Sequence, residues 1–441
     1  MSEVALSSLQ RAVARLRATW PTDVLAGLLF LLLGIALVLH PYATGRDMPG
    51  DFDARFNLSL LEFFYRTLLA VLHGQSANFL DAPFYYPWPR VTNFSDTHWG
   101  DAEVYALFRA LGVNALASFQ AWFVAGFALT YVATFVSLRK LGLKTWGSAV
   151  GVFLFTFCLP MAAQFGHVQL VYRLWVPPAV VALHRFLTRR SLRAASACVL
   201  FVALQLAVSI YPGLFLCMLL ASYAAALWLV ARASFPPSIW AGLRAARGAE
   251  LVVAGVLLAA GVMVLVIVAM RYLDVQSMYG FARSWDMVVG MLPRPGSYLL
   301  AGASELWPDL SERFSFPLVW EHQIFPGLSA IIPLAWFGLS KRARARQPLA
   351  APLLATLAML FAVTIDLGGH TLYRLVYAIP GFSAMWAVTR VILVMMLPLA
   401  ALLGMMIDAC LSGCHPYPLP VECGDWGSLA DDDGHGRFGA G

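Results

Sequence analysis

Charged residues are scarce in this sequence. Asp, Glu, Lys and Arg make up 12% of its 441 residues, whereas 60% are hydrophobic and the mean hydropathy is +0.72. A soluble domain carries about a quarter charged residues, because its surface must stay hydrated. This composition therefore excludes a soluble globule of the same size.

Cysteine is also scarce, and its placement argues against a disulfide framework. Of the six cysteines, Cys158, Cys198 and Cys217 lie inside apolar runs, where a free cysteine acts as a small hydrophobe. The pair Cys414-His415 and the later Cys423 match the spacing of no zinc module. We expect neither disulfides nor structural zinc.

Three other patterns are missing. The sequence has no series of ten-residue segments with alternating hydrophobicity, which excludes a transmembrane β-barrel. It has no evident internal repeat, which disfavours a transporter built from inverted repeats. The first apolar run, Val24 to His40, is followed by no small-residue cleavage site. We therefore expect that run to be a first membrane helix and not a signal peptide.

What the sequence does contain is a series of long apolar runs. Their length of about 20 residues is the length at which a helix crosses the hydrocarbon core. Lipid offers no hydrogen bonds to the backbone, so such runs must be helical. The pattern predicts an all-α, polytopic transmembrane bundle of about ten spans. The expected spans are 23–40, 115–137, 146–163, 172–187, 194–211, 213–231, 249–270, 325–340, 349–366 and 384–409.

The basic residues predict the orientation of this bundle. They gather in the links that share a side with the N-terminus. These links contain Arg139, Lys140 and Lys144, then Arg185, Arg189, Arg190 and Arg193, then Arg232, Arg244 and Arg247, then Lys341, Arg342, Arg344 and Arg346. By the positive-inside rule that side is cytoplasmic. The net charge of +6 is thereby explained by topology, and we expect no nucleic-acid partner.

The order of polar and apolar segments predicts five regions. They are a cytoplasmic N-terminus at 1–22, a transmembrane module at 23–270 with a long first outer loop at 41–114, a second outer loop at 271–324, C-terminal transmembrane helices at 325–410, and a disordered, Gly- and Asp-rich tail at 411–441. Two amphipathic stretches of the first outer loop, 57–73 and 101–111, are expected to be helices in the membrane interface.

The densest polar cluster lies at the start of the first outer loop. Asp51, Asp53 and Asn57 occur there, and Asp53 and Asn57 share a helical face if the interfacial helix begins nearby. Two carboxylates and an amide can hold a divalent metal ion through their oxygen atoms. One carboxylate can instead act as a general base. The alternative is that Asp51 or Asp53 only caps the helix.

Other polar residues are candidates at the same side of the membrane. Asp96 and His98 can join a metal or phosphate site, or serve as turn and cap residues. His167 lies at the outer end of a span, where a polar group either faces a cavity or packs with a hydrogen bond. In the second outer loop the candidates are Arg271, Tyr272, Arg283, Arg294, Glu305, Glu321 and His322.

Arg390 is a special case, because it lies within the last apolar run. An arginine inside a span needs an anionic partner, which either the protein or a ligand phosphate can supply. The alternative is that its side chain extends to the outer interface.

Several segments resemble a group of bacterial multi-pass membrane proteins with the architecture of the GT-C superfamily. They are GDFDARFN, LLEFFYR, APFYYPWPRVTNFSDTHWGDAEVYALFRALG and QFGHVQLVYRLWVPPAV. The resemblance covers about Ala43 to Leu187 well and continues weakly through PRPGSYLL, EHQIFPGLS and PGFSAMWAVTRVI. GT-C proteins are integral-membrane glycosyltransferases that use polyprenyl-phosphate-linked sugars.

This resemblance implies roles for the residues above. An acidic residue of the first outer loop would be catalytic or linked to a divalent cation such as Mg²⁺ or Mn²⁺. The matching positions are Asp51 and Asp53, and Asp53 is favoured because Asn57 follows it at helical spacing. Substrate-binding roles would fall to Asn57, Asp96, His98, His167, Arg294 and Arg390, with the two arginines on the donor phosphate. Trp386 stands where related chains often carry a second basic residue.

The expected function is that of an inner-membrane glycosyltransferase. It would transfer a sugar from a polyprenyl-phosphate carrier to an extracytoplasmic glycan or lipid acceptor. Two alternatives remain open: a transporter or flippase of a lipid-linked sugar, and a non-catalytic membrane protein with a GT-C-like fold. A transporter would place functional polar groups near the bilayer midplane, where this sequence has few.

Overall fold

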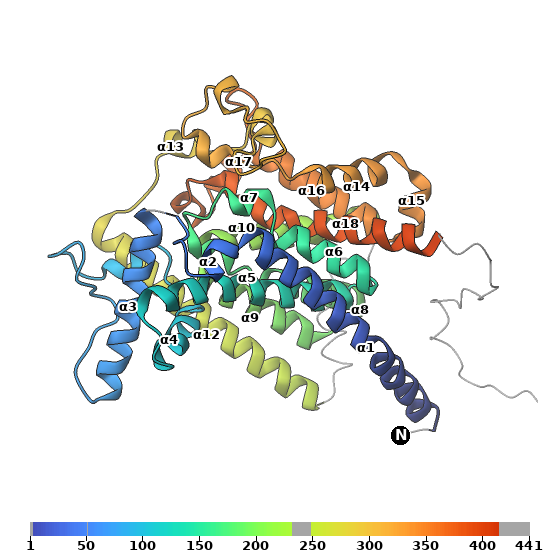
Figure 1. The fold of residues 1–441 in the computed structure, drawn as a ribbon, viewed down its shortest axis with the longest axis horizontal. Coiled ribbons are helices and arrows are strands. Elements are labelled where there is room, and N and C mark those ends of the chain that lie inside the picture. The colour runs from blue at the N-terminus through green and yellow to red at the C-terminus, as the bar shows by residue number, and fades with distance from the viewer. Residues whose placement is uncertain (1–2, 51, 232–247, 414–441) are drawn as a thin grey trace, which may run out of the picture.

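A computed structural model describes residues 3–50, 52–231 and 248–413 of the chain. Within these ranges every regular element is helical, which confirms the predicted all-α class (Figure 1). The α-helices are α1 (Glu3–Val38), α2 (His40–Ala43), α3 (Phe52–Leu72), α4 (Ala102–Ala110), α5 (Ala115–Lys140), α6 (Thr145–Thr156), α7 (Leu159–Ala162), α8 (Val176–Arg189), α9 (Leu192–Val208), α10 (Ile210–Ala231), α12 (Gly248–Tyr279), α13 (Trp285–Val289), α14 (Leu328–Leu339), α15 (Lys341–Arg346), α16 (Ala350–Thr364), α17 (Tyr373–Tyr377) and α18 (Ile392–Gly413). The 3-10 helices are η1 (Val91–Asn93), η2 (Val168–Val171), η3 (Pro295–Leu299), η4 (Ser311–Arg313), η5 (Val319–His322), η6 (Phe382–Ala384) and η7 (Val388–Val391).

Six segments of the described chain are long and apolar enough to cross a membrane. They are Pro21–Val38, Ala115–Lys140, Thr145–Ala162, Ile210–Val230, Gly248–Tyr279 and Val388–Ser412. Each overlaps one of the spans expected from hydropathy, and together they make the chain a multi-pass membrane protein.

The other four expected spans are shorter helices. α8 has 14 residues, α9 has 17, α14 has 12 and α16 has 15. At 1.5 Å per residue, helices of this length extend for roughly 18–26 Å, less than the hydrocarbon thickness of about 30 Å. A bundle of about ten crossings therefore stays a prediction.

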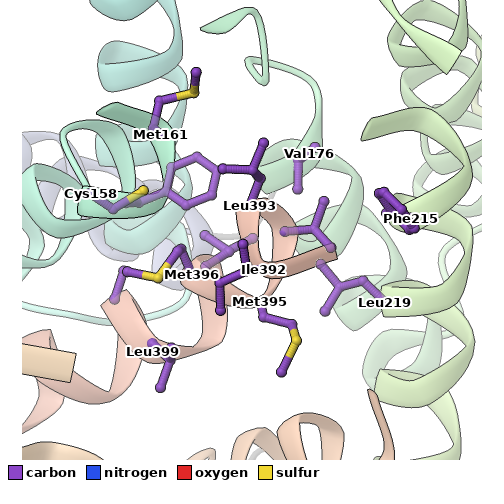
Figure 2. Close-up of a cluster of buried hydrophobic side chains, with 14 of the residues drawn as sticks. Cys158, Met161, Val176, Phe215, Leu219, Ile392, Leu393, Met395, Met396 and Leu399 are labelled. Atoms are coloured by element: carbon purple, nitrogen blue, oxygen red, sulfur yellow. The ribbon is translucent and has the colours of Figure 1, made fainter. Parts of the chain in front are cut away.

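The last helix forms the centre of the bundle. In the most apolar 18-residue stretch of Val388–Ser412, 89% of the residues are buried, compared with 11% in Pro21–Val38 and 17% in the most apolar stretch of α12. Figure 2 shows side chains of α18 packed among residues of the α6–α7 region, α8 and α10, including Cys158, Val176 and Phe215. α1 and α12 instead expose apolar side chains, as expected of helices that face lipid.

α18 approaches α6 closely because small residues line the contact. A Cβ atom added to Gly404 would lie 2.5 Å from the carbonyl oxygen of Gly147, and one added to Gly151 would lie 2.6 Å from that of Ala400. Spacing of small residues every four positions allows backbones of membrane helices to pack directly. Asp408 completes the contact, since its carboxylate accepts hydrogen bonds from backbone N–H groups at the start of α6.

The first outer loop contains the two predicted helices, α3 and α4. Figure 1 shows both at the end of the bundle opposite the N-terminus of α1. Glu62 of α3 joins them, because it accepts hydrogen bonds from Tyr105 (2.7 Å) and Arg109 (2.9 Å) of α4. The preceding segment is fixed to α9, since the Thr97 hydroxyl donates to the carbonyl of Ala207 at 2.8 Å.

Two helices continue past the region boundaries expected from the sequence. The second outer loop was expected to begin at 271, but α12 continues as a helix to Tyr279. Contacts with the first outer loop stabilise this extension: the hydroxyls of Tyr272 and Tyr279 donate to backbone carbonyls of Ser95 and Pro89. The tail was expected to begin at 411, but α18 continues to Gly413, and the rest of the tail lies outside the described residues.

Candidate functional site

Four charged side chains from distant segments form one connected cluster. Asp53 lies in the first turn of α3, His167 precedes η2, Glu321 lies in η5 and Arg390 lies in η7. His167 Nδ1 is 2.8 Å from Asp53 Oδ2, and its Nε2 is 3.2 Å from Glu321 Oε1. Arg390 Nη2 is 2.7 Å from the same Glu321 oxygen. We refer to these four residues as the charged cluster.

A close backbone contact brings α3 to His167. Gly50 has a φ of +66°, and a Cβ atom at this position would lie 2.5 Å from the Cα of Gly166. Only glycine fits such a contact without strain, because it tolerates positive φ and has no side chain. The turn before α3 can therefore lie directly against the residue that precedes His167, which sets the Asp53–His167 distance.

Glu321 and Arg390 are the buried half of the cluster. Their side chains are only 5% and 6% exposed. Arg390 binds Glu321 with two parallel hydrogen bonds, from Nε to Oε2 at 3.1 Å and from Nη2 to Oε1 at 2.7 Å. Paired geometry of this kind gives the strongest charge-assisted contacts. The anionic partner expected for Arg390 is thus a protein carboxylate, and its side chain does not extend to the interface.

His167 connects the buried pair to the accessible carboxylate. Its Nε2 atom lies close both to Glu321 and to Arg390 Nη2, which is 2.7 Å away. A neutral ring with its proton on Nδ1 accepts from Arg390, whereas a charged ring donates to Glu321. Burial lowers the pKa of His167, but its hydrogen bonds to Asp53 and Glu321 raise that pKa above the usual value.

Asp53 is the accessible member of the cluster. Its side chain is 57% exposed, whereas that of His167 is 26% exposed. The hydrogen bond from His167 lowers the pKa of Asp53, although partial burial opposes this effect. The pKa of Glu321 is lowered to about 2, because hydrogen bonds from His167 and Arg390 outweigh its burial. Both carboxylates are therefore ionised at neutral pH, and only that of Asp53 can reach a ligand in solvent.

Behind Asp53 lies a second polar group that is fully enclosed. Asn57 Nδ2 donates to the backbone carbonyl of Asp53 at 2.7 Å, and its Oδ1 is 2.6 Å from His98 Nε2. His98 Nδ1 is 3.1 Å from the buried carboxylate of Asp101. Although burial lowers the pKa of His98, the charge of Asp101 raises it, consistent with a ring that donates from both nitrogens. This group holds α3 in place beneath Asp53.

Asp96 connects its own loop to two other segments. Its carboxylate accepts from Gln169 Nε2 at 2.9 Å and from the backbone N–H of Ile210, at the start of α10, at 2.7 Å. Since Asn57, Asp96 and His98 are all buried and satisfied by protein groups, the structure places them beside the charged cluster but away from solvent. Their roles in substrate binding stay predictions.

Arg294 is separate from the charged cluster. Its Nε is 3.8 Å from Asp366, and its guanidinium lies over the ring of Phe316. Binding of a donor phosphate by Arg294 or Arg390 would have to compete with a protein carboxylate, and both roles stay predictions.

The divalent-cation site expected at Asp51 and Asp53 is only partly covered by the described residues. No group of three or more His, Cys, Asp or Glu side chains is arranged there to hold a metal ion. Asp53 is engaged by His167 through Oδ2, and Asp51 lies outside the described residues. The cation site expected at Asp51 and Asp53 therefore stays a prediction, and no step below depends on a metal.

Sequence reasoning did not single out two residues of these networks. In the sequence, Glu321 is only one of several polar candidates in the second outer loop, and Asp101 is the start of an amphipathic stretch. The need for an anion near Arg390 was a usable signal, but no spacing rule connects it with a residue in another loop.

Comparison of this chain with family models, curated proteins and solved structures finds no match. A functional interpretation therefore has two supports, the geometry of the charged cluster and the resemblance in the sequence.

The raised pKa of His167 predicts a pH-dependent stability. A histidine whose pKa is higher in the folded than in the unfolded protein stabilises the fold when it is protonated. This stabilisation is complete below the unfolded-state pKa of about 6.5 and is lost as the pH rises through the folded-state pKa. The carboxylates of Asp53 and Glu321, with lowered pKa values, stay ionised over this range. We expect the melting temperature of the wild type to exceed that of His167→Gln at pH 6 by more than at pH 9, measured in detergent.

The exposed His370→Gln is the control for this measurement, since its side chain belongs to no cluster of the described chain. If the melting temperatures of wild type and His167→Gln differ by the same amount at pH 6 and at pH 9, the prediction is contradicted.

Proposed function

We propose that the chain is a membrane glycosyltransferase that uses a polyprenyl-phosphate-linked sugar. The observation that carries this proposal is the exposed, ionised carboxylate of Asp53, fixed by His167 above a buried ion pair. A carboxylate held in this way is suited to general-base catalysis. Its position in the acidic first outer loop is the one at which the GT-C resemblance expects the catalytic acidic residue.

The proposed reaction is a single displacement with inversion at the anomeric carbon. Asp53 Oδ2 is engaged by His167, which leaves Oδ1 to accept the proton of an acceptor hydroxyl. The acceptor oxygen forms a bond to the anomeric carbon while the bond from that carbon to the lipid phosphate oxygen breaks. The lipid phosphate leaves with the electron pair, and Asp53 retains the proton.

Positive charge near the leaving phosphate would lower the barrier, because negative charge develops there in the transition state. In the charged cluster this charge belongs to Arg390 and, when protonated, to His167. His167 is partly exposed and lies beside Asp53, so it can contact the phosphate directly. Arg390 would act from beneath it.

The proposal includes a location. Basic links on the side of the N-terminus favour a cytoplasmic N-terminus, which puts α3 and Asp53 outside the bacterial inner membrane. A lipid-linked donor diffuses laterally in that membrane, so a site at its outer surface can receive it. The acceptor would be an extracytoplasmic glycan or lipid.

Asp53→Asn tests the proposed function. The substitution keeps the size of the side chain but removes the base, so transfer should fall by about 10²–10⁴-fold. The readout is the mass spectrum of envelope glycans in a strain that lacks the gene and carries either the wild type or the variant. Transfer from a polyprenyl-phosphate sugar by the purified protein gives the rate.

Asp47→Asn is the matched control, because Asp47 is an exposed acid of the same loop and lies outside the charged cluster. It should leave the glycans unchanged. Unchanged glycans on loss of the gene would disprove the transferase proposal, and full activity of Asp53→Asn would remove Asp53 from the chemistry.

A further inference from the structure

A cavity lies at the end of the bundle opposite the charged cluster. Its volume is about 500 Å³, and three segments form its walls: residues 141–144 between α5 and α6, residues 346–349 from the end of α15 to the start of α16, and four residues of α18, Met405, Asp408, Ala409 and Ser412. We refer to it as the basic cavity, because Lys144 and Arg346 line it.

The charge of the basic cavity is positive on balance. Lys144 and Arg346 are both exposed, and within the described chain neither forms a salt bridge. The Lys144 ammonium donates to the Ser412 hydroxyl at 2.7 Å, which holds it at the rim. One carboxylate, Asp408, also lines the cavity, but its oxygens accept from the backbone N–H groups of Lys144 (2.7 Å) and Gly147 (3.2 Å).

The remaining wall of the cavity is apolar. Leu141, Leu349 and Met405 come from three different elements and line the same space. The cavity therefore offers two cations and a hydroxyl beside a hydrophobic surface. This combination matches an amphiphile with a phosphate head.

We propose that the basic cavity binds the headgroup of an anionic phospholipid, with Lys144 and Arg346 on its phosphate. The cavity lies where membrane-spanning α5 and α18 end, which is the depth of the headgroups. Its volume is within the range of about 300–1,000 Å³ that encloses a small organic ligand and exceeds the space that a phosphate ion fills. Basic pockets between membrane helices on the positively charged side bind anionic headgroups.

Native mass spectrometry of the full chain in neutral detergent tests this proposal. Phosphatidylglycerol should remain bound at concentrations where phosphatidylcholine does not. The double variant Lys144→Gln, Arg346→Gln should bind phosphatidylglycerol roughly twenty-five-fold more weakly, at about five-fold for each cation. Thermal unfolding of each variant reports whether it is folded.

The double variant Lys140→Gln, Lys341→Gln is the matched control. It removes two exposed cations that lie at the same end of the bundle but do not line the cavity. It should keep wild-type binding. Ala409→Phe is a second test, because it fills the cavity and leaves both cations; it should weaken binding of the lipid.

Three results would overturn the proposal. Equal binding of the two lipids would show that no anionic headgroup is selected. Equal loss in the control would assign the effect to diffuse surface charge. Binding of inorganic phosphate that competes fully with the lipid and survives Ala409→Phe would assign the cavity to a soluble anion.

Discussion

Arg390→Met is expected to destabilise the fold by about 3–5 kcal/mol. The substitution leaves Glu321 buried with an ionised carboxylate and without its main partner, since that side chain is only 5% exposed. Removal of one member of a buried ion pair costs far more than removal of a surface charge. The measurement is thermal unfolding of the purified protein in detergent.

A double variant separates the charge effect from packing. Arg390→Met with Glu321→Leu replaces the pair by apolar side chains and should recover most of the lost stability. Arg313→Gln is the control, because it removes an exposed arginine from the same outer region and should change stability by less than about 0.5 kcal/mol. If the double variant is no more stable than Arg390→Met, loss of packing and not the unpaired charge is the cause.

Gly404→Leu is expected to separate α18 from α6 and to destabilise the fold by about 1–3 kcal/mol or more. Even a Cβ atom at Gly404 would lie 2.5 Å from the carbonyl oxygen of Gly147, so the two backbones must move apart. That movement would also draw Asp408 away from the start of α6. Thermal unfolding in detergent measures the loss.

Gly255 of α12 provides the comparison. A Cβ atom there meets nothing within 4 Å, and the residue lies within a helix. Gly255→Ala should therefore be neutral or should stabilise the helix by up to about 1 kcal/mol. A Gly404→Leu protein that melts at the same temperature as Gly255→Ala would show that the α6–α18 contact can adapt.

Hydropathy was sufficient to predict the spans that have full length. Val24 to His40 and the region of α18 are unmistakable as apolar runs, because lipid imposes both their length and their composition. It could not separate full spans from helices such as α14, of 12 residues, because hydrophobic side chains serve equally to face lipid and to pack against α18. Composition alone does not distinguish the two environments.

The candidate site was predictable only in its local part. The interval from Asp53 to Asn57 correctly indicated a shared helix, which begins at Phe52, because helical spacing is a local property. The other members of the charged cluster, His167, Glu321 and Arg390, lie far from Asp53 in the sequence, and no periodic rule relates their positions to it. For Arg390, the sequence left two alternatives open, an anionic partner or extension to the interface, and only the fold identifies Glu321 as the partner.

The separation of these partners along the chain also bears on how the protein is made. Residues 53, 167, 321 and 390 are synthesised in that order, yet the cluster is complete only when the last of them has been added. Until then Glu321 has no arginine to neutralise it, and its burial is unfavourable. Assembly of the charged cluster is thereby coupled to insertion of the final helix, so a nascent chain that stops before Arg390 should be loosely packed there and sensitive to membrane proteases.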